Sequence, residues 1–177
     1  MEVIKLKIIV SNRTREHMKV HGNDFFTDWE ELLHQCEQKG QFDHIRGLFV
    51  KMVMSFDQPI GISTVVPTTA QDEIVYAKRK NRTVYTRFVK NRLPQIINSV
   101  VVLLNQNRQN KEEYYLITLF PGEGSEKEPE DKNINSLEEL KTCLEFWDHH
   151  AIIYDESILE PETLTLECPY HNLLMTV

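Results

Sequence analysis

From Gly61 to Phe120 the chain contains a series of short β-branched and aromatic runs, and this series constrains the fold more than any other feature. Turn-forming stretches such as PTTAQ, KRKN and NRQNKE separate the runs, which read GISTVV, DEIVYAK, TVYTRFVK, NSVVVLLNQ and EYYLITLF. Runs of this length and composition are typical of strands. Because no segment of helical length lies between them, neighbouring strands are expected to pair antiparallel.

Helical patterns flank this series on both sides. One helix is predicted after Thr27, which would form a capping box with Glu30, and another after Ser136, whose partner would be Glu139. The run over residues 2–11 is rich in Ile and Val and predicts a first strand. The sequence therefore predicts an α+β fold with N-terminal helices, an antiparallel sheet of four to five strands and a C-terminal helix packed on that sheet.

Length and composition favour a single domain over residues 1–177 with an exposed acidic loop at 121–135. No apolar run approaches the roughly 20 residues that span a bilayer, so no membrane partner is expected. The three cysteines, Cys36, Cys143 and Cys168, are odd in number and far apart. This pattern favours free thiols in a reducing compartment over disulfides or a structural zinc site, and predicts a cytoplasmic protein without cofactor or metal.

Charge is unevenly distributed along the chain. The net charge is -7, with 27 acidic and 20 basic residues, yet the segment from residue 78 to residue 92 contains seven Lys or Arg and no acid. We call residues 78–92 the basic segment. An acidic protein with one cationic segment is expected to contact RNA or another polyanion locally, or an acidic protein partner. The alternative is a solvated hairpin whose cations pair with carboxylates of the same chain.

Strand alternation predicts how the basic segment presents its side chains. In TVYTRFVK, Tyr85 and Arg87 point to the same side and are expected on an accessible face. An arginine fork can bind a phosphate through two hydrogen bonds, and an exposed tyrosine can stack on an unpaired base. The predicted nucleic-acid contacts are therefore Lys78, Lys80, Arg82, Tyr85, Lys90 and Arg92.

Two histidines and one threonine are further candidates for chemistry. His44 lies near Arg46, and a histidine near a basic face can act as a general base because its pKa is close to neutrality. His17 and His21 are one helical turn apart, a spacing that can chelate a metal, but the sequence names no third ligand. Thr118 lies among apolar residues near the end of a predicted strand, where its hydroxyl could bind a phosphate or only stabilise the sheet.

The strand YYLITLFPG, the preceding basic hairpin and the histidines of the N-terminal helical part together resemble the barnase–EndoU–colicin–RelE-like ribonuclease superfamily. Members of its phage-encoded and toxin-like branches often close with a strand of the form Y-x-(I/V)-T-x-(F/Y)-P. This sequence matches that form at Tyr115, Ile117, Thr118, Phe120 and Pro121. The resemblance covers roughly residues 41–122. Separately, the stretch from DEIVYAKRKNR to FVKNR resembles small proteins of bacteria and their phages.

The resemblance implies a metal-independent endoribonuclease. Its catalytic residues would be His44 or His17 as the base, Arg79 or Arg87 as the stabiliser of the phosphorane charge, and Thr118 as the group that orients a phosphate oxygen. A second hypothesis is a non-catalytic regulatory protein. Such a protein would dock nucleic acid or an acidic partner through residues 78–92, or self-associate through its acidic loop and basic segment.

Overall fold

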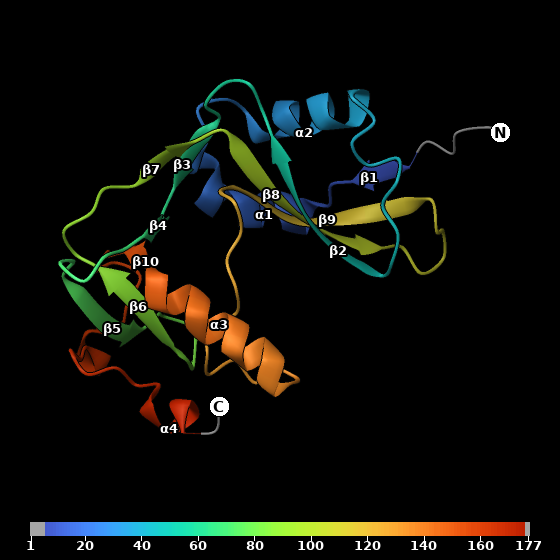
Figure 1. The fold of residues 1–177 in the computed structure, drawn as a ribbon. Helices are drawn as coiled ribbons and strands as arrows, with labels where there is room; N and C mark the ends of the chain where they lie inside the picture. The colour runs from blue at the N-terminus through green and yellow to red at the C-terminus, as the bar shows by residue number, and fades with distance from the viewer. Residues whose placement is uncertain (1–5, 176–177) are drawn as a thin grey trace. The chain divides into compact units, whose positions relative to one another are not determined.

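Two four-stranded sheets organise the described residues, 6–175, of the computed structural model (Figure 1). Each sheet belongs to a separate compact unit: unit 1 comprises Met1–Ser63 and Ile96–Gly124, and unit 2 comprises Thr64–Gln95 and Ser125–Val177. The sequence predicts one domain, because no linker-like composition marks the points at which the chain passes from one unit to the other.

The unit 1 sheet has the strand order β1-β9-β8-β2. β1 pairs parallel with β9, whereas β9, β8 and β2 are antiparallel neighbours. The elements of this unit are β1 (Lys7–Ile9), α1 (Asn12–His21), the 3-10 helix η1 (Gly22–Asp24), α2 (Trp29–Gln38), β2 (Phe49–Ser55), β3 (Gly61–Ser63), β8 (Ser99–Gln106) and β9 (Glu113–Pro121). Residues 2–5 of the predicted first strand lie outside the described residues.

An apolar cluster joins α1 and α2 to one face of the unit 1 sheet. Met18 of α1 and Cys36 of α2 are fully buried against sheet residues such as Val102 and Leu116. The helix predicted after Thr27 is present, but the capping residue is wrong. Asp28 is the N-cap, and its carboxylate accepts hydrogen bonds from the backbone N–H groups of Glu30 and Glu31.

Gly61 lies where two backbone segments of unit 1 approach each other closely. Its backbone pairs with Phe25, and a Cβ at this position would collide with the Asp24 carbonyl and lie 2.7 Å from Pro121 Cγ. We therefore expect Gly61→Ala to lower the free energy of unfolding by about 1–3 kcal/mol, as overpacking does. Chemical denaturation measures this change, and Gly22→Ala is the matched control, since its Cβ would meet only Trp29 at 3.7 Å. Equal losses in the two variants would contradict the prediction.

The unit 2 sheet has the order β4-β10-β6-β5. β6 runs parallel to β10 and antiparallel to β5, and β4 is antiparallel to β10. The elements are β4 (Val65–Pro67), β5 (Ile74–Lys78), β6 (Tyr85–Val89), α3 (Leu137–His149), β10 (His150–Ile153), the 3-10 helix η2 (Pro161–Thr163) and α4 (His171–Leu174). A two-stranded pairing of β3 with β7 (Gln95–Ile97) completes the described strands.

The α+β class is confirmed, but the single antiparallel sheet is wrong. DEIVYAK and TVYTRFVK pair with each other in unit 2, whereas NSVVVLLNQ and EYYLITLF pair in unit 1. The predicted helix after Ser136 is confirmed, with the Ser136 hydroxyl accepting from Glu139 N at 3.0 Å. This helix, α3, contacts β10 rather than closing the chain, since β10, η2 and α4 follow it.

The segment after β10 covers the outer edge of β5. Thr165 and Tyr76 exchange two backbone hydrogen bonds of 2.9 and 2.8 Å, and Glu160 N donates to Lys78 O at 2.8 Å. These bonds pair the outer edge of β5. β6 lies between β5 and β10, and its last four residues are buried. None of the described helices has both the length and the apolar character needed to cross a bilayer.

Candidate functional site

His17 and Thr118 lie together in unit 1 although 101 positions separate them in the sequence. His17 Nε2 is 3.2 Å from Thr118 Oγ1, so a hydrogen bond joins the exposed imidazole to a largely buried hydroxyl. α1 runs beside β9 beyond the end of β1, and the Thr14 hydroxyl donates to Leu116 O at 2.7 Å. This bond satisfies a carbonyl at the strand edge that β1 leaves unpaired, and it fixes α1 next to Thr118.

A bulge in β9 immediately precedes Thr118. Leu116 pairs with Leu104 and Thr118 pairs with Leu103, which leaves Ile117 without a partner on β8. Bulges redirect the side chains beside them and occur often near functional sites. The Thr118 hydroxyl is directed toward α1, where it also lies 3.9 Å from the Met18 sulfur.

His21 and Asp24 extend this group of side chains. The rings of His17 and His21 make an edge-to-face contact with centroids 4.9 Å apart. Burial is the main cause that lowers the pKa of His21; the charge of His17 lowers it further, while Asp24 opposes the shift. Burial raises the pKa of Asp24, and His21 opposes that change. A neutral imidazole is therefore favoured at His21, beside the imidazole that contacts Thr118.

Metal binding by the His17–His21 pair would need a third ligand. Within the described part of the chain, no three His, Cys, Asp or Glu side chains are placed to hold a metal ion together. The site consists of the imidazoles of His17 and His21, the carboxyl group of Asp24 and the hydroxyl of Thr118. Such a group can accept and hold a proton next to a bound oxygen.

His44, the rival candidate for the base, lies elsewhere in unit 1. It is exposed in the turn that follows α2, whereas His17 is the histidine in contact with Thr118. The sequence leaves His44 and His17 as alternatives, because it does not show which of them lies beside Thr118.

Arg79 and Arg82 of the basic segment form ion pairs inside unit 2. Glu128, which is 5% exposed, accepts from Arg79 at 3.0 Å, lies 3.6 Å from Arg82, and contacts the buried hydroxyl of Thr86 at very short range. Burial lowers the pKa of Arg79 and the charge of Glu128 partly offsets this effect. These cations are held by a carboxylate of the same chain.

Arg87 does not lie on an accessible face, so the prediction that Tyr85 and Arg87 share such a face is wrong. Its side chain is 9% exposed, and it donates to the Thr68 hydroxyl at 2.8 Å and to His150 O at 2.9 Å. The reason is that β6 lies between β5 and β10 and is covered on both faces. Tyr85 is half-buried, and its backbone N–H donates to Glu130 at 2.9 Å.

The remaining predicted nucleic-acid contacts also have partners within unit 2. Lys78 and Lys90 lie over the rings of Tyr85 and Tyr154, at 5.3 and 4.7 Å from the ring centroids. Lys80 donates to Ser157 O at 2.9 Å. Arg92 binds Asp72 through two hydrogen bonds of 2.7 and 3.0 Å, and these bonds, with help from Thr69, lower the pKa of Asp72 to about 2.

The acidic loop predicted at 121–135 is only partly exposed. Glu128 and Pro129 are buried, because the loop folds onto the β5–β6 hairpin through the ion pairs of Glu128. Trp147 of α3 holds the same loop by donating to the carbonyls of Glu126 and Lys127 at 3.1 and 2.9 Å. The acidic and basic segments are thus partners within one chain.

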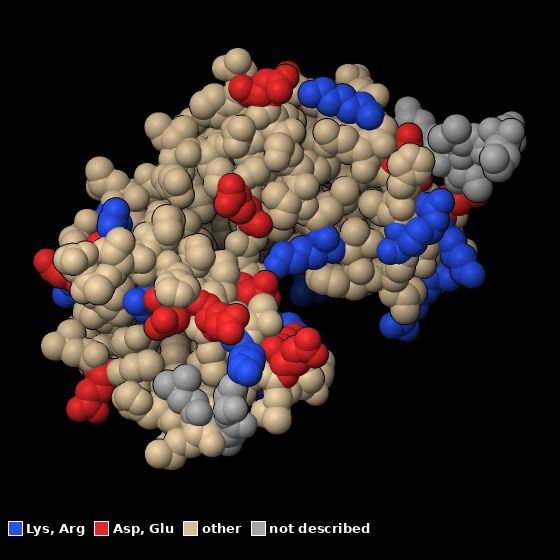
Figure 2. Space-filling model, in the orientation of Figure 1, with Lys and Arg blue, Asp and Glu red and all other residues tan. Residues whose placement is uncertain are grey.

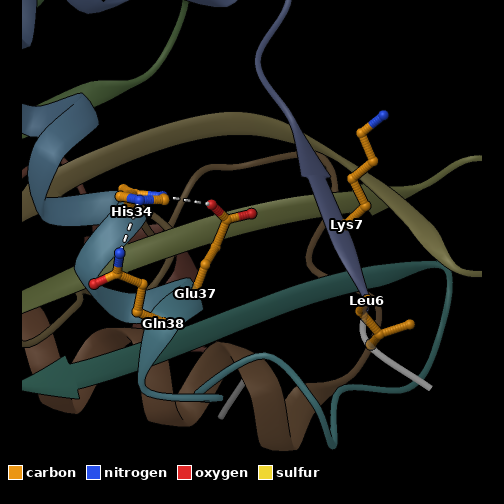
Figure 3. A pocket seen from close by; sticks show the side chains of 5 residues that line it. All are labelled: Leu6, Lys7, His34, Glu37 and Gln38. Carbon is orange, nitrogen blue, oxygen red and sulfur yellow. Dashed lines mark hydrogen bonds and ion pairs between the residues drawn. The ribbon is translucent and has the colours of Figure 1, made fainter. Parts of the chain in front are cut away.

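A cavity of about 220 Å³ lies between β1 and α2 in unit 1 (Figure 3). His34 stands between Glu37 and Gln38, with its ring nitrogens 3.6 Å from the carboxylate and 3.0 Å from the amide, and Lys7 points away from them. Glu37 also accepts from Ile8 N at 3.3 Å. The Glu37–Ile8 bond ties α2 to β1, and the contacts of His34 with Glu37 and Gln38 lie within α2, so these polar side chains have partners without a ligand.

No protein-family model and no curated protein matches the chain. Among solved structures, a conserved hypothetical protein from Toxoplasma gondii ME49 is similar, with a TM-score of 0.62 and 14% sequence identity. The match covers 89% of this chain and 98% of that one. At this identity the similarity shows a shared fold and carries no information on activity.

Proposed function

We propose that this chain is a metal-independent endoribonuclease whose reacting groups lie in unit 1. The observation that carries the proposal is the 3.2 Å contact between His17 Nε2 and Thr118 Oγ1. The contact joins a candidate base to the threonine of the strand motif that resembles the ribonuclease superfamily. The exposed imidazole of His17 leaves room for a substrate beside it.

The chemistry follows from these groups. His17 takes the proton of a ribose 2′-hydroxyl, and the 2′-oxygen attacks the adjacent phosphorus. The bond from phosphorus to the 5′-oxygen breaks, and that oxygen takes up a proton. The products are a 2′,3′-cyclic phosphate and a 5′-hydroxyl. Thr118 orients a phosphate oxygen, and His21 makes an edge-to-face contact with the His17 ring.

Arg79 and Arg87 are less suited to stabilise the phosphorane than the resemblance implies. Arg79 is paired with Glu128, and Arg87 is buried against Thr68 and His150. The alternative function, polyanion binding through residues 78–92, is less well supported for the same reason. Its cations pair with carboxylates, carbonyls and rings of unit 2, as expected for a hairpin stabilised by its own chain.

Thr118→Val tests the role of the hydroxyl. We expect the variant to cut labelled RNA about 10²-fold more slowly in the presence of EDTA, since loss of one positioned donor has an effect of this size. Thr142→Val, at an exposed position of α3, is the matched control and is expected to cut at the wild-type rate. Wild-type protein that binds RNA in a salt-sensitive way without cutting it would support the non-catalytic alternative instead.

A further inference from the structure

Arg13 is an exposed cation that lies one helical turn before His17 on α1. Residues four positions apart share one face of a helix, with their Cβ atoms about 5–6 Å apart. Helical side chains also lean toward the N-terminus of their helix, so His17 leans toward the turn that carries Arg13. Arg13, His17 and His21 therefore form a row along one face of α1.

The guanidinium of Arg13 has neither a hydrogen bond nor an ion pair to any of the described residues, 6–175. The other cations of α1 are paired. Arg15 binds Glu30 at 3.0 Å, and Lys19 binds Glu16 at 2.7 Å. The first turn of α1, which is fully described, contains no acid. Arg13 is thus available to an anion that approaches His17.

Other exposed cations of unit 1 lie at the far end of β9. Lys7 pairs in register with Glu113, which precedes Thr118 by five residues, or about 16 Å along a strand. The turn over residues 107–112 carries two more cations and lies beyond Glu113. In unit 2, Figure 2 shows Lys and Arg side chains next to Asp and Glu around α3. Arg13 is the unpaired cation that shares a helix face with His17.

The proposed reaction needs a cation at this place. Attack of the 2′-oxygen on phosphorus adds negative charge to the phosphate oxygens, and fixed groups aimed at such developing charge stabilise it. Arginine suits this task, because its planar fork donates two parallel hydrogen bonds to a phosphate. Arg79 and Arg87 belong to unit 2 and are engaged there by Glu128, Thr68 and His150.

We infer that Arg13 binds the scissile phosphate beside His17 and is a catalytic residue of this site. The inference rests on the proposed function and assigns the cation that its mechanism requires. His17 takes the proton of the 2′-hydroxyl, and Thr118 orients one phosphate oxygen. Arg13 donates hydrogen bonds to the phosphate and stabilises the phosphorane charge, and no bond to Arg13 itself forms or breaks.

Cleavage of labelled RNA in the presence of EDTA tests this role. We expect Arg13→Ala to cut about 10²–10³-fold more slowly, the range for loss of one group that stabilises developing charge. Arg13→Lys keeps the charge without the fork and should cut at a rate between those of Arg13→Ala and the wild type. Arg15→Ala is the matched control, because Arg15 is an exposed arginine of the same helix whose surface ion pair contributes little stability. It should cut at the wild-type rate.

Binding of a single-stranded 12-mer of 2′-O-methyl RNA gives a readout that does not depend on cleavage, because its blocked 2′-oxygen cannot attack. Each phosphate contact to a single strand contributes about 0.7 to the slope of log K against log salt concentration. We expect Arg13→Ala to bind this RNA more weakly and to reduce the magnitude of the slope by about 0.7. Arg15→Ala should leave the affinity and the slope unchanged.

The outcomes separate this inference from the proposed function. If Arg13→Ala reduces the affinity and the slope while the wild type does not cut RNA, the phosphate contact stands and the ribonuclease proposal fails. If the wild type cuts RNA and Arg13→Ala cuts at the same rate, the inference is wrong and the His17–Thr118 site stands. Equal losses in Arg13→Ala and Arg15→Ala would also overturn the inference, since they would reflect surface charge in general.

Discussion

His17→Ala is expected to lower metal-independent RNA cleavage by about 10²–10⁴-fold, the range for loss of a general base. The imidazole of His17 is the group that lies 3.2 Å from the Thr118 hydroxyl and is exposed to solvent. Its removal leaves the 2′-hydroxyl of a bound ribose without a proton acceptor. Cleavage of labelled RNA with EDTA present measures the loss, at saturating and at limiting RNA concentrations.

His44→Ala is the matched control, because His44 is also an exposed histidine of unit 1. It should retain wild-type cleavage. An NMR titration of His21 gives a readout that does not depend on activity: the His17 charge and burial both lower the pKa of His21, so His17→Ala is expected to raise it. Loss of cleavage in His44→Ala, with full activity in His17→Ala, would assign the base to the other histidine and contradict this site.

Local signals in the sequence were sufficient for most individual elements. The capping serine of α3 and the strand character of DEIVYAK and EYYLITLF depend on neighbouring residues, and the structure confirms each of them. Sheet membership depends instead on partners far along the chain. Alternation along TVYTRFVK does not reveal that β10, more than 60 residues later, pairs with β6 and buries Arg87.

The candidate site also depends on contacts between residues that are far apart in the sequence. The sequence predicts both of its central residues, His17 and Thr118, as candidates, but it does not show that they are in contact and does not separate His17 from His44. Their contact depends on the bulge at Ile117 and on the hydrogen bond from Thr14 to Leu116. His21 follows His17 by one helical turn. Asp24, in the 3-10 helix η1, follows His21 by three residues, a helical spacing that the sequence predictions do not use.

Glu128→Gln is expected to destabilise unit 2 by about 3 kcal/mol. Removing one partner of a buried ion pair leaves the other charge without compensation, at a cost of about 3–5 kcal/mol. The lower value applies because Arg79 is 23% exposed and Arg82 is 53% exposed, so water offsets part of the loss. The Gln amide oxygen can still accept from the Thr86 hydroxyl.

Fluorescence-monitored urea unfolding can assign this loss to unit 2. The chain has two tryptophans: Trp29 in unit 1 and Trp147 in unit 2. In a Trp29→Phe background, Trp147 reports on α3 and on the loop that it binds. Glu130→Gln is the control; its exposed carboxylate accepts one backbone hydrogen bond from Tyr85, and we expect a change of about 1 kcal/mol or less.

The change in the free energy of unfolding that Glu128→Gln causes tests whether the basic segment is structural or a binding surface. A loss near 3 kcal/mol would mean that folded unit 2 needs Glu128 to compensate the charges of Arg79 and Arg82. These two cations would then be part of the fold, and a polyanion could bind them only by displacing Glu128. An unchanged midpoint in Glu128→Gln would contradict the structural role and favour the basic segment as a binding surface.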